Sequence, residues 1–123
     1  MKLIINKREL EFKLGIGFLG ELIEETGKSI QDVLEGLDKN PYKYIPLAMF
    51  VSAKYALERK GEEVTFSKIE FIDWLEADGG ISDANKSAIT FIQELTKDLT
   101  KDVPKDEAED PKGEKKTLIG QEM

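Results

Sequence analysis

The chain has 123 residues, of which 40% are hydrophobic and 35% charged, a length and composition typical of one soluble globular domain. Its net charge is −7 at pH 7. A negatively charged protein is repelled by a phosphate backbone and cannot displace its counterions, so we expect no nucleic-acid partner. Cysteine and histidine are absent, which excludes disulfides, Ser-His and Cys-His nucleophile pairs, and the usual transition-metal sites.

The first 14 residues have the pattern of a β-hairpin. Leu10, Phe12 and Leu14 alternate with charged residues, as in a strand with one buried face. A short apolar segment before them can pair with this strand, because Asn6 in the connection tolerates a positive φ. We therefore predict a hairpin over residues 2–14, which is stable only where helices cover it.

Residues 15–20 are GIGFLG, a literal G-x-G-x-x-G between a predicted strand and a predicted helix. In a Rossmann domain this pattern presents a helix N-terminus to a pyrophosphate. The second strand that should end in an acidic residue about 20 positions on is missing, since the residues before Asp38 have helical periodicity. We expect the glycines to be structural and no cofactor to bind, so that bulky replacement of Gly17 or Gly20 destabilises the fold.

Two short helices are predicted next. The first covers residues 18–26 and is stopped by Gly27, and the second begins at Ser29, whose side chain can cap it. The second helix has the clearest amphipathic pattern of the chain, with apolar residues at i, i+3, i+4 and i+7. These residues are Ile30, Val33, Leu34 and Leu37.

The segment over residues 41–60 predicts a long helix. It begins with a proline, which suits the first helical position, and Gly61 can adopt the left-handed conformation that ends it. Pro46 lacks the N–H that would bond the carbonyl of Tyr42, so we expect it to kink or restart the helix. Few side chains between residues 44 and 57 are polar. We therefore predict the central helix of the fold, the alternative being that part of it faces a partner.

Two further helices are predicted from capping signals. Ser67 begins a capping box before one, and Ser82 is the expected N-cap of the last, which Pro104 must end. The composition then changes to few apolar residues with charges of both signs, which is typical of a segment that cannot fold alone. We predict one mainly α domain over residues 1–103, with about five helices around the long one and the N-terminal β-hairpin, and a flexible charged tail over residues 104–123.

Carboxylates offer the remaining chemistry. Glu94, Asp98 and Asp102 lie at i, i+4 and i+8 and could hold a hard cation, but lysines three residues after the first two favour a salt-bridged solvated face. Asp73 with Glu76 or Asp78 could form an acid/base pair, yet no recognisable nucleophile or phosphate loop accompanies them. We expect neither a metal site nor enzymatic activity.

No membrane partner is expected either. The longest uncharged apolar run, residues 44–53, is far too short to span a bilayer, and the N-terminus lacks the pattern of a signal peptide. These features predict a cytoplasmic protein.

Surplus apolar helix surface favours a protein-binding role. An acidic, mostly helical domain can hold amphipathic partner helices in grooves. The predicted partner-binding residues are Phe50, Tyr55, Phe71 and Trp74. The alternative is that these aromatic residues form the core, because most large apolar side chains are buried. A very apolar helix in so small a chain is also compatible with a homo-oligomer.

Four segments carry a family resemblance through their order and spacing. They are MKLIINKRELEFKLGIGFLGEL, NPYKYIPLAMFVSAKYALERKGE, FIDWLEADGGI and ELTKDLTKDVPKDE. In this combination the chain resembles the tail assembly chaperones of long-tailed phages and prophages of Gram-positive bacteria. The resemblance covers about residues 1–107, and none of the segments is a catalytic signature.

The resemblance implies a non-enzymatic role in the host cytoplasm. Such chaperones bind the long, helical tape measure protein, keep it soluble while tail-tube subunits polymerise around it, and leave before the virion is complete. The family commonly makes a second, longer product by programmed frameshifting, whose added domain recruits the tail tube protein. This chain ends in GEKKTLIGQEM and would be the short form, with the longer form as a further partner. The alternative is a small acidic regulatory or scaffold module of a phage or host.

Overall fold

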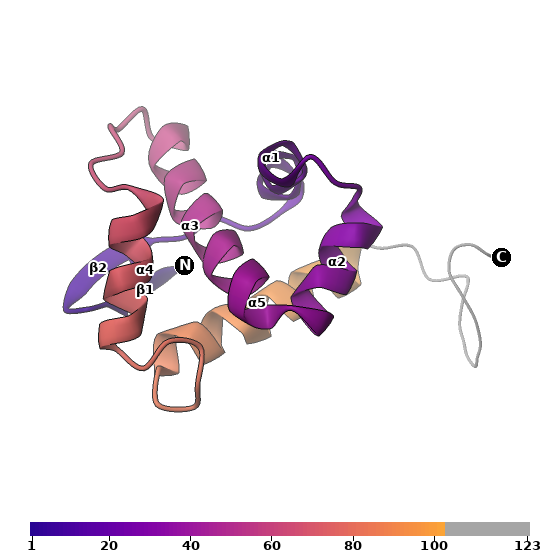
Figure 1. The fold of residues 1–123 in the computed structure, drawn as a ribbon. Helices are drawn as coiled ribbons and strands as arrows, with labels where there is room; N and C mark the ends of the chain where they lie inside the picture. Colours follow the sequence, from indigo (N-terminus) through magenta and orange to yellow (C-terminus); the bar gives the residue numbers. More distant parts are fainter. Residues whose placement is uncertain (103–123) are drawn as a thin grey trace, which may run out of the picture.

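The computed structural model describes residues 1–102. Over these residues an N-terminal hairpin is followed by five helices (Figure 1), which confirms the predicted fold, mainly α with a small β-hairpin. The elements are β1 (Lys2–Ile5), β2 (Arg8–Glu11), α1 (Ile16–Thr26), α2 (Ile30–Lys39), α3 (Pro41–Arg59), α4 (Lys68–Ala77) and α5 (Lys86–Asp102). The predicted tail over residues 104–123 lies outside the described residues.

The hairpin turn follows from two residues with positive φ. Asn6 has φ 50° and Lys7 φ 68°, which is the geometry of a type I′ turn and fits the twist of antiparallel strands. The second strand ends at Glu11, three residues before the predicted end. Beyond it the chain lies against α3, where the buried Ser52 donates a hydrogen bond from Oγ to the carbonyl oxygen of Lys13 at 2.9 Å.

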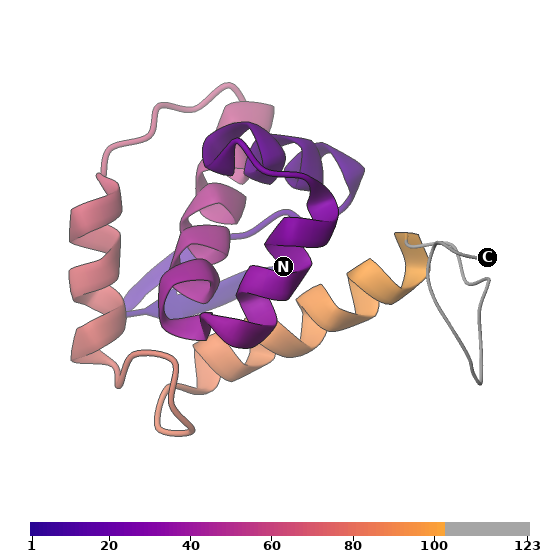
Figure 2. The same cartoon turned by 45° about the vertical axis from the view of Figure 1, so that its right-hand side comes forward.

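The long helix α3 is the central element of the fold. It has buried residues on nearly all sides and packs against α1, α2, α4 and β2. Figures 1 and 2 show α4 on one side of it and α1 and α2 on the other, with α5 crossing below. The helix is continuous through Pro46, so it does not restart there as we expected. Burial of Ile45 and Ala48 on either side of the proline offsets the one missing backbone hydrogen bond.

Most helix ends lie where the capping signals place them. The Ser29 hydroxyl accepts a hydrogen bond from the Asp32 N–H at 3.2 Å, and Ser67 and Glu70 form the reciprocal bonds of a capping box. Gly61 has φ 73° and donates to a carbonyl of the last turn of α3, which is the left-handed end expected of a helix C-terminus.

The N-cap predicted for the last helix is wrong. The side chain of Asn85 caps α5, because its Oδ1 accepts a hydrogen bond from the Ala88 N–H at 3.2 Å while its Nδ2 donates to the Gly80 carbonyl at 2.7 Å. Ser82 belongs to the preceding turn, where its hydroxyl donates to the Gly79 carbonyl at 2.8 Å. The side-chain amide of Asn85 can accept a hydrogen bond from the first turn of α5 and also donate one to the turn before it. The hydroxyl of Ser82, three residues before Asn85, cannot make both bonds.

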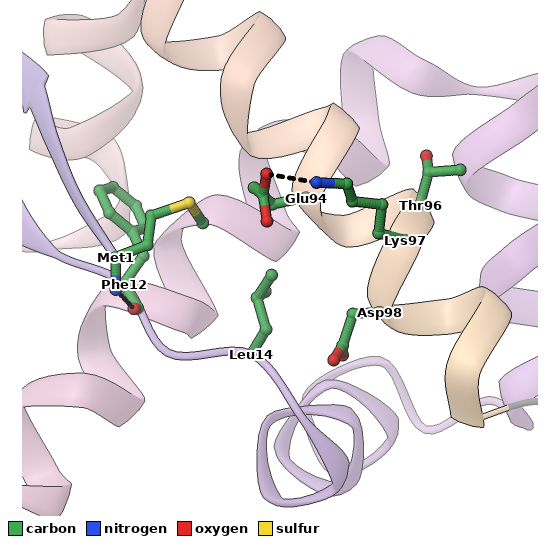
Figure 3. A pocket seen from close by; sticks show the side chains of 7 residues that line it. All are labelled: Met1, Phe12, Leu14, Glu94, Thr96, Lys97 and Asp98. Atoms are coloured by element: carbon green, nitrogen blue, oxygen red, sulfur yellow. Dashed lines mark hydrogen bonds and ion pairs between the residues drawn. The ribbon is translucent and has the colours of Figure 1, made fainter.

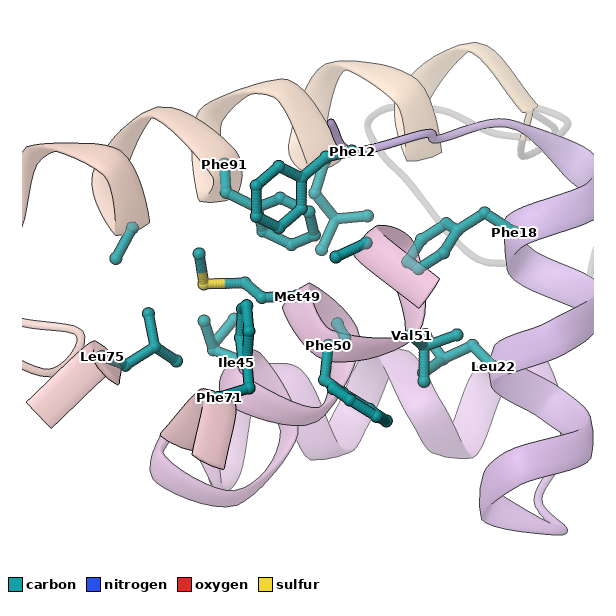
Figure 4. Close-up of a cluster of buried hydrophobic side chains, with 14 of the residues drawn as sticks. Phe12, Phe18, Leu22, Ile45, Met49, Phe50, Val51, Phe71, Leu75 and Phe91 are labelled. Atoms are coloured by element: carbon teal, nitrogen blue, oxygen red, sulfur yellow. The ribbon is translucent and has the colours of Figure 1, made fainter. Parts of the chain in front are cut away.

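A cluster of phenylalanines ties the hairpin to the helices (Figure 4). Phe12, which follows β2, has its ring centroid 5.7 Å from that of Phe91 in α5 and 6.4 Å from that of Phe71 in α4. All three side chains are almost completely buried. Because a lone hairpin is only marginally stable, this burial is what fixes it on the helical layer.

The Glu11 carboxylate gives the hairpin a dependence on pH. A hydrogen bond from the Met1 ammonium, 2.8 Å away, and the positive charges of Met1 and Lys60 hold the pKa of the Glu11 carboxyl below its ordinary value of 4.5, although burial acts in the opposite direction. A carboxyl whose pKa is lower in the folded state stabilises the fold above its ordinary pKa. This contribution is lost as the pH falls through the lower, folded-state pKa.

We therefore expect Glu11→Gln to lower the free energy of unfolding at pH 7 by about 0.5 kcal/mol, the size typical of a partly exposed ion pair. Urea unfolding of a chain that begins at Met1 measures this, and the difference from the wild type should shrink as the pH is lowered below 4.5. Glu9→Gln, on the exposed face of the same strand, is the matched control. An equal loss at every pH would show that the charge of Glu11 is not the cause.

Candidate partner-binding surface

Three of the four predicted partner-binding residues lie in one aromatic cluster. The ring centroids of Phe50 and Phe71 are 5.9 Å apart, and those of Phe71 and Trp74 are 6.4 Å apart. Phe71 is fully buried and Phe50 is only 9% exposed. In the folded chain these two residues therefore serve the core, and Trp74 is the member that reaches the surface.

Phe66 completes the cluster and was missed by the sequence analysis. Its ring lies 5.3 Å from Trp74 and 6.0 Å from Phe71, centroid to centroid. A sequence signal for it exists, because an apolar residue just before an N-cap commonly packs on the fifth residue beyond itself, the hydrophobic staple. Phe66 precedes the N-cap Ser67 and meets Phe71 in this way.

Arg8 covers one face of Trp74. Its guanidinium carbon lies 4.2 Å from the centre of the indole ring, within the range of a cation–π interaction. The indole is half-buried, with Arg8 of the hairpin and Phe66 of the cluster as neighbours. Part of its surface is therefore free to meet a partner.

Tyr55 lies apart from the cluster, against α1. A Cβ added to Gly17 would overlap the Tyr55 hydroxyl, so this glycine allows close packing of α1 on α3, as predicted. The expectation for Gly20 is wrong. Gly20 is exposed, and a Cβ there would meet no atom within 4 Å, so its replacement creates no clash in the fold.

The N-terminus of α1, where the glycine pattern would bind a phosphate, holds a carboxylate of the chain itself. Asp98 in α5 accepts a hydrogen bond through Oδ2 from the Gly15 N–H at 2.9 Å. Gly15 has φ 108°, a conformation that favours glycine. A negative charge at this position is stabilised by the helix dipole, so the contact fastens α5 to α1.

Two of the other predicted carboxylates have partners within the chain, whereas Asp73 and Glu76 lie exposed on α4. Glu94 pairs with Lys97 at 3.3 Å, and Asp78 accepts a hydrogen bond from the Asn6 N–H at the hairpin turn. The side chain of Asp102 lies outside the described part. Within residues 1–99 no three acidic side chains gather in a group that could hold a metal ion.

An open hollow of 640 Å³ lies beside α5, next to the N-terminus (Figure 3). Met1 and Leu14 form its apolar side, while Glu94 and Lys97 of α5 form a paired, charged side. The wall on α5 is therefore charged, whereas the wall on the side of the N-terminus is apolar.

A groove of 270 Å³ between α2 and α5 is more apolar. On α5 its apolar residues follow the spacing i, i+3 and i+7, and the partly exposed apolar residues come from both helices. The lining residues are Leu34, Leu37, Asp38, Ile45, Ile92, Leu95, Thr96 and Leu99. We call this feature the α2/α5 groove. Its apolar residues were visible in the sequence as two helix stripes, but their exposure depends on how the two helices meet.

The α2 side of the groove is acidic. This helix, residues 30–39, carries three carboxylates and one lysine, and that lysine, Lys39, is paired with Glu35 at 3.0 Å. This part of the surface therefore attracts basic segments and repels acidic ones.

Comparisons of the chain with models of protein families, with curated proteins and with solved structures give no match. Within the described residues, none of the helices has the length and apolar character needed to cross a membrane. The function must therefore be inferred from the residues and the surfaces themselves.

Proposed function

We propose that the chain is a tail assembly chaperone that binds a phage tape measure protein and keeps it soluble during tail assembly, without enzymatic activity. The resemblance of residues 1–107 to that family is the starting point. The observation that supports it best is the α2/α5 groove, an apolar groove between two helices, of which α2 is acidic.

The groove suits one helix of a long helical partner. Amphipathic helices enter such grooves with apolar side chains at i, i+3, i+4 and i+7, and Leu34 and Leu99 are half-buried residues on opposite sides of this one. Lysine or arginine beside the partner's apolar stripe would meet Asp38 at the edge. A small apolar contact of this kind gives weak, reversible binding. Reversible binding is required of a chaperone that must release its partner before the virion is complete.

Tyr55 and Trp74 are proposed as additional contacts. Both are half-buried, so a partner can reach them without unfolding the chain, whereas Phe50 and Phe71 would first have to leave the core. We further propose that the chain acts in the host cytoplasm and is not retained in the virion. The longer frameshifted form, and through it the tail tube protein, are its other proposed partners.

Leu34→Asp tests the proposal at the groove. The variant should reduce the amount of tape measure protein that co-purifies from cells expressing both by about tenfold, because a charge replaces an apolar anchor in the centre of the contact. The proposal expects the tape measure protein to be the product of a long helical reading frame downstream of the gene. Co-purification is measured by quantitative gel, with circular dichroism to show that the helices persist.

Ile69→Asp is the matched control, because Ile69 is 72% exposed and lies on α4, away from the groove. It should leave co-purification unchanged. Loss in the Ile69 variant with retention in the Leu34 variant would place the contact elsewhere, and no co-purification with the wild-type chain would contradict the proposed function itself.

A further inference from the structure

The outer face of α1 carries an apolar ridge. Ile16, Gly20 and Ile23 follow one another at i, i+4 and i+7, so they lie on one face of the helix. Ile16 is 85% exposed and Ile23 37%, and the exposed Gly20 lies between them. We call these three residues the α1 ridge. Large apolar side chains at this spacing are normally the buried face of a helix, and here they face outward.

The glycine in the middle of the ridge has no role within the described residues. Glycine forms helices less well than alanine, so a helical glycine needs another reason to be there. Gly17 has one, because Tyr55 packs against it. An added Cβ on Gly20 would meet no atom within 4 Å, and its φ is not positive. A helix from outside that approaches the backbone closely at Gly20 would supply the reason.

The charges of α1 indicate the chemistry of that helix. The element carries Glu21, Glu24 and Glu25 and no lysine or arginine. Glu24 lies one turn after Gly20, directly beside the ridge. A second copy of the chain would bring the same carboxylates together across the contact, which is unfavourable. A helix with lysine or arginine beside its apolar stripe would instead meet opposite charges.

We infer that the α1 ridge is a docking site for a cationic amphipathic helix of another protein. A large apolar side chain of the partner lies over Gly20, between Ile16 and Ile23, and a basic residue on its flank pairs with Glu24. The ridge belongs to α1, which contributes no residue to the α2/α5 groove. The inference therefore goes beyond the proposed function and does not depend on it.

The test uses a fluorescein-labelled, 21-residue helical peptide of leucine and lysine, with leucine at i, i+3, i+4 and i+7, and the full chain carrying Leu34→Asp, because the α2/α5 groove could otherwise hold the same peptide. Fluorescence anisotropy should show binding that Gly20→Leu weakens by about tenfold, since the new side chain fills the place of the partner's anchor. Because this position has open space, the midpoint of urea unfolding should not fall. Loss of binding without loss of stability distinguishes a docking site from a folding defect.

Gln93→Leu is the control, because it adds the same side chain at an exposed position of α5 and should leave binding unchanged. A peptide with glutamate in place of lysine should bind much more weakly. Equal binding by the Leu34→Asp chain with and without Gly20→Leu would overturn the inference. Two other results would also overturn the inference. A dimer seen in sedimentation and dissociated by Gly20→Leu would assign the ridge to a second copy of the chain. Binding of a synthetic 103–123 peptide that Gly20→Leu abolishes would assign the ridge to the chain's own tail.

Discussion

Phe71→Ala should lower the free energy of unfolding by about 3–5 kcal/mol, the cost typical of removing a buried phenylalanine. Phe71 has no exposed surface, and its ring lies within 6.4 Å, centroid to centroid, of the rings of Phe12, Phe50, Phe66 and Trp74. The cavity would therefore open where the hairpin, α3 and α4 meet. A loss of this size is a large part of the total stability of a small domain.

Urea unfolding followed by circular dichroism and by the fluorescence of Trp74, the one tryptophan of the chain, measures the effect. Ile69→Ala on the same helix is the control, because Ile69 is 72% exposed and its truncation should change stability by no more than about 0.5 kcal/mol. Similar losses for the two variants would contradict the arrangement of α4 described above.

Gly36→Ala should destabilise the chain by about 1–3 kcal/mol, because it overfills a tight contact between α2 and α3. A Cβ at Gly36 would lie 2.5 Å from a ring carbon of Tyr44. The clash involves the body of the ring rather than its hydroxyl, and Tyr44 is only 7% exposed, so the ring has little room to move. The better helix propensity of alanine, about 1 kcal/mol, recovers only part of the loss.

Gly20→Ala is the matched variant and should have the opposite sign. It makes the same change inside a helix, but with open space around the new methyl group, so it should stabilise the chain by about 0.5–1 kcal/mol. Urea midpoints of the two variants and the wild type give the comparison. If both alanine variants were more stable than the wild type, helix propensity rather than packing would decide the stability. That result would contradict the close contact of Gly36 with Tyr44.

Features set by neighbouring residues in the chain could be predicted from the sequence. The positive φ of Asn6, the cap at Ser29 and the capping box at Ser67 need only side chains a few residues apart. The fold class followed from these local signals together with the apolar character of α3. Periodicity and capping thus gave the elements and most of their ends.

Features that depend on contacts between distant elements could not be predicted in the same way. Pro46 stays within a continuous helix because neighbouring elements cover α3 on nearly all sides. Whether Gly17 or Gly20 meets a side chain depends on where Tyr55 lies. Asn85 replaces Ser82 as the cap because its amide also bonds Gly80 across the turn.

The candidate surface was only partly visible in the sequence for the same reason. Apolar stripes identify residues that could meet a partner, but the fold decides which of them it covers. It places Phe50 and Phe71 in the core, leaves Tyr55 and Trp74 at its edge, and keeps the apolar residues of the α2/α5 groove partly exposed.

The solubility of the tape measure protein tests the central claim most directly. The protein is expressed alone and together with the wild-type chain, and the soluble fraction is measured and passed over a size-exclusion column. Our account predicts that the chain raises the soluble fraction and elutes with the tape measure protein as one complex. An equally insoluble tape measure protein in both cases, with the chain eluting alone, would contradict it.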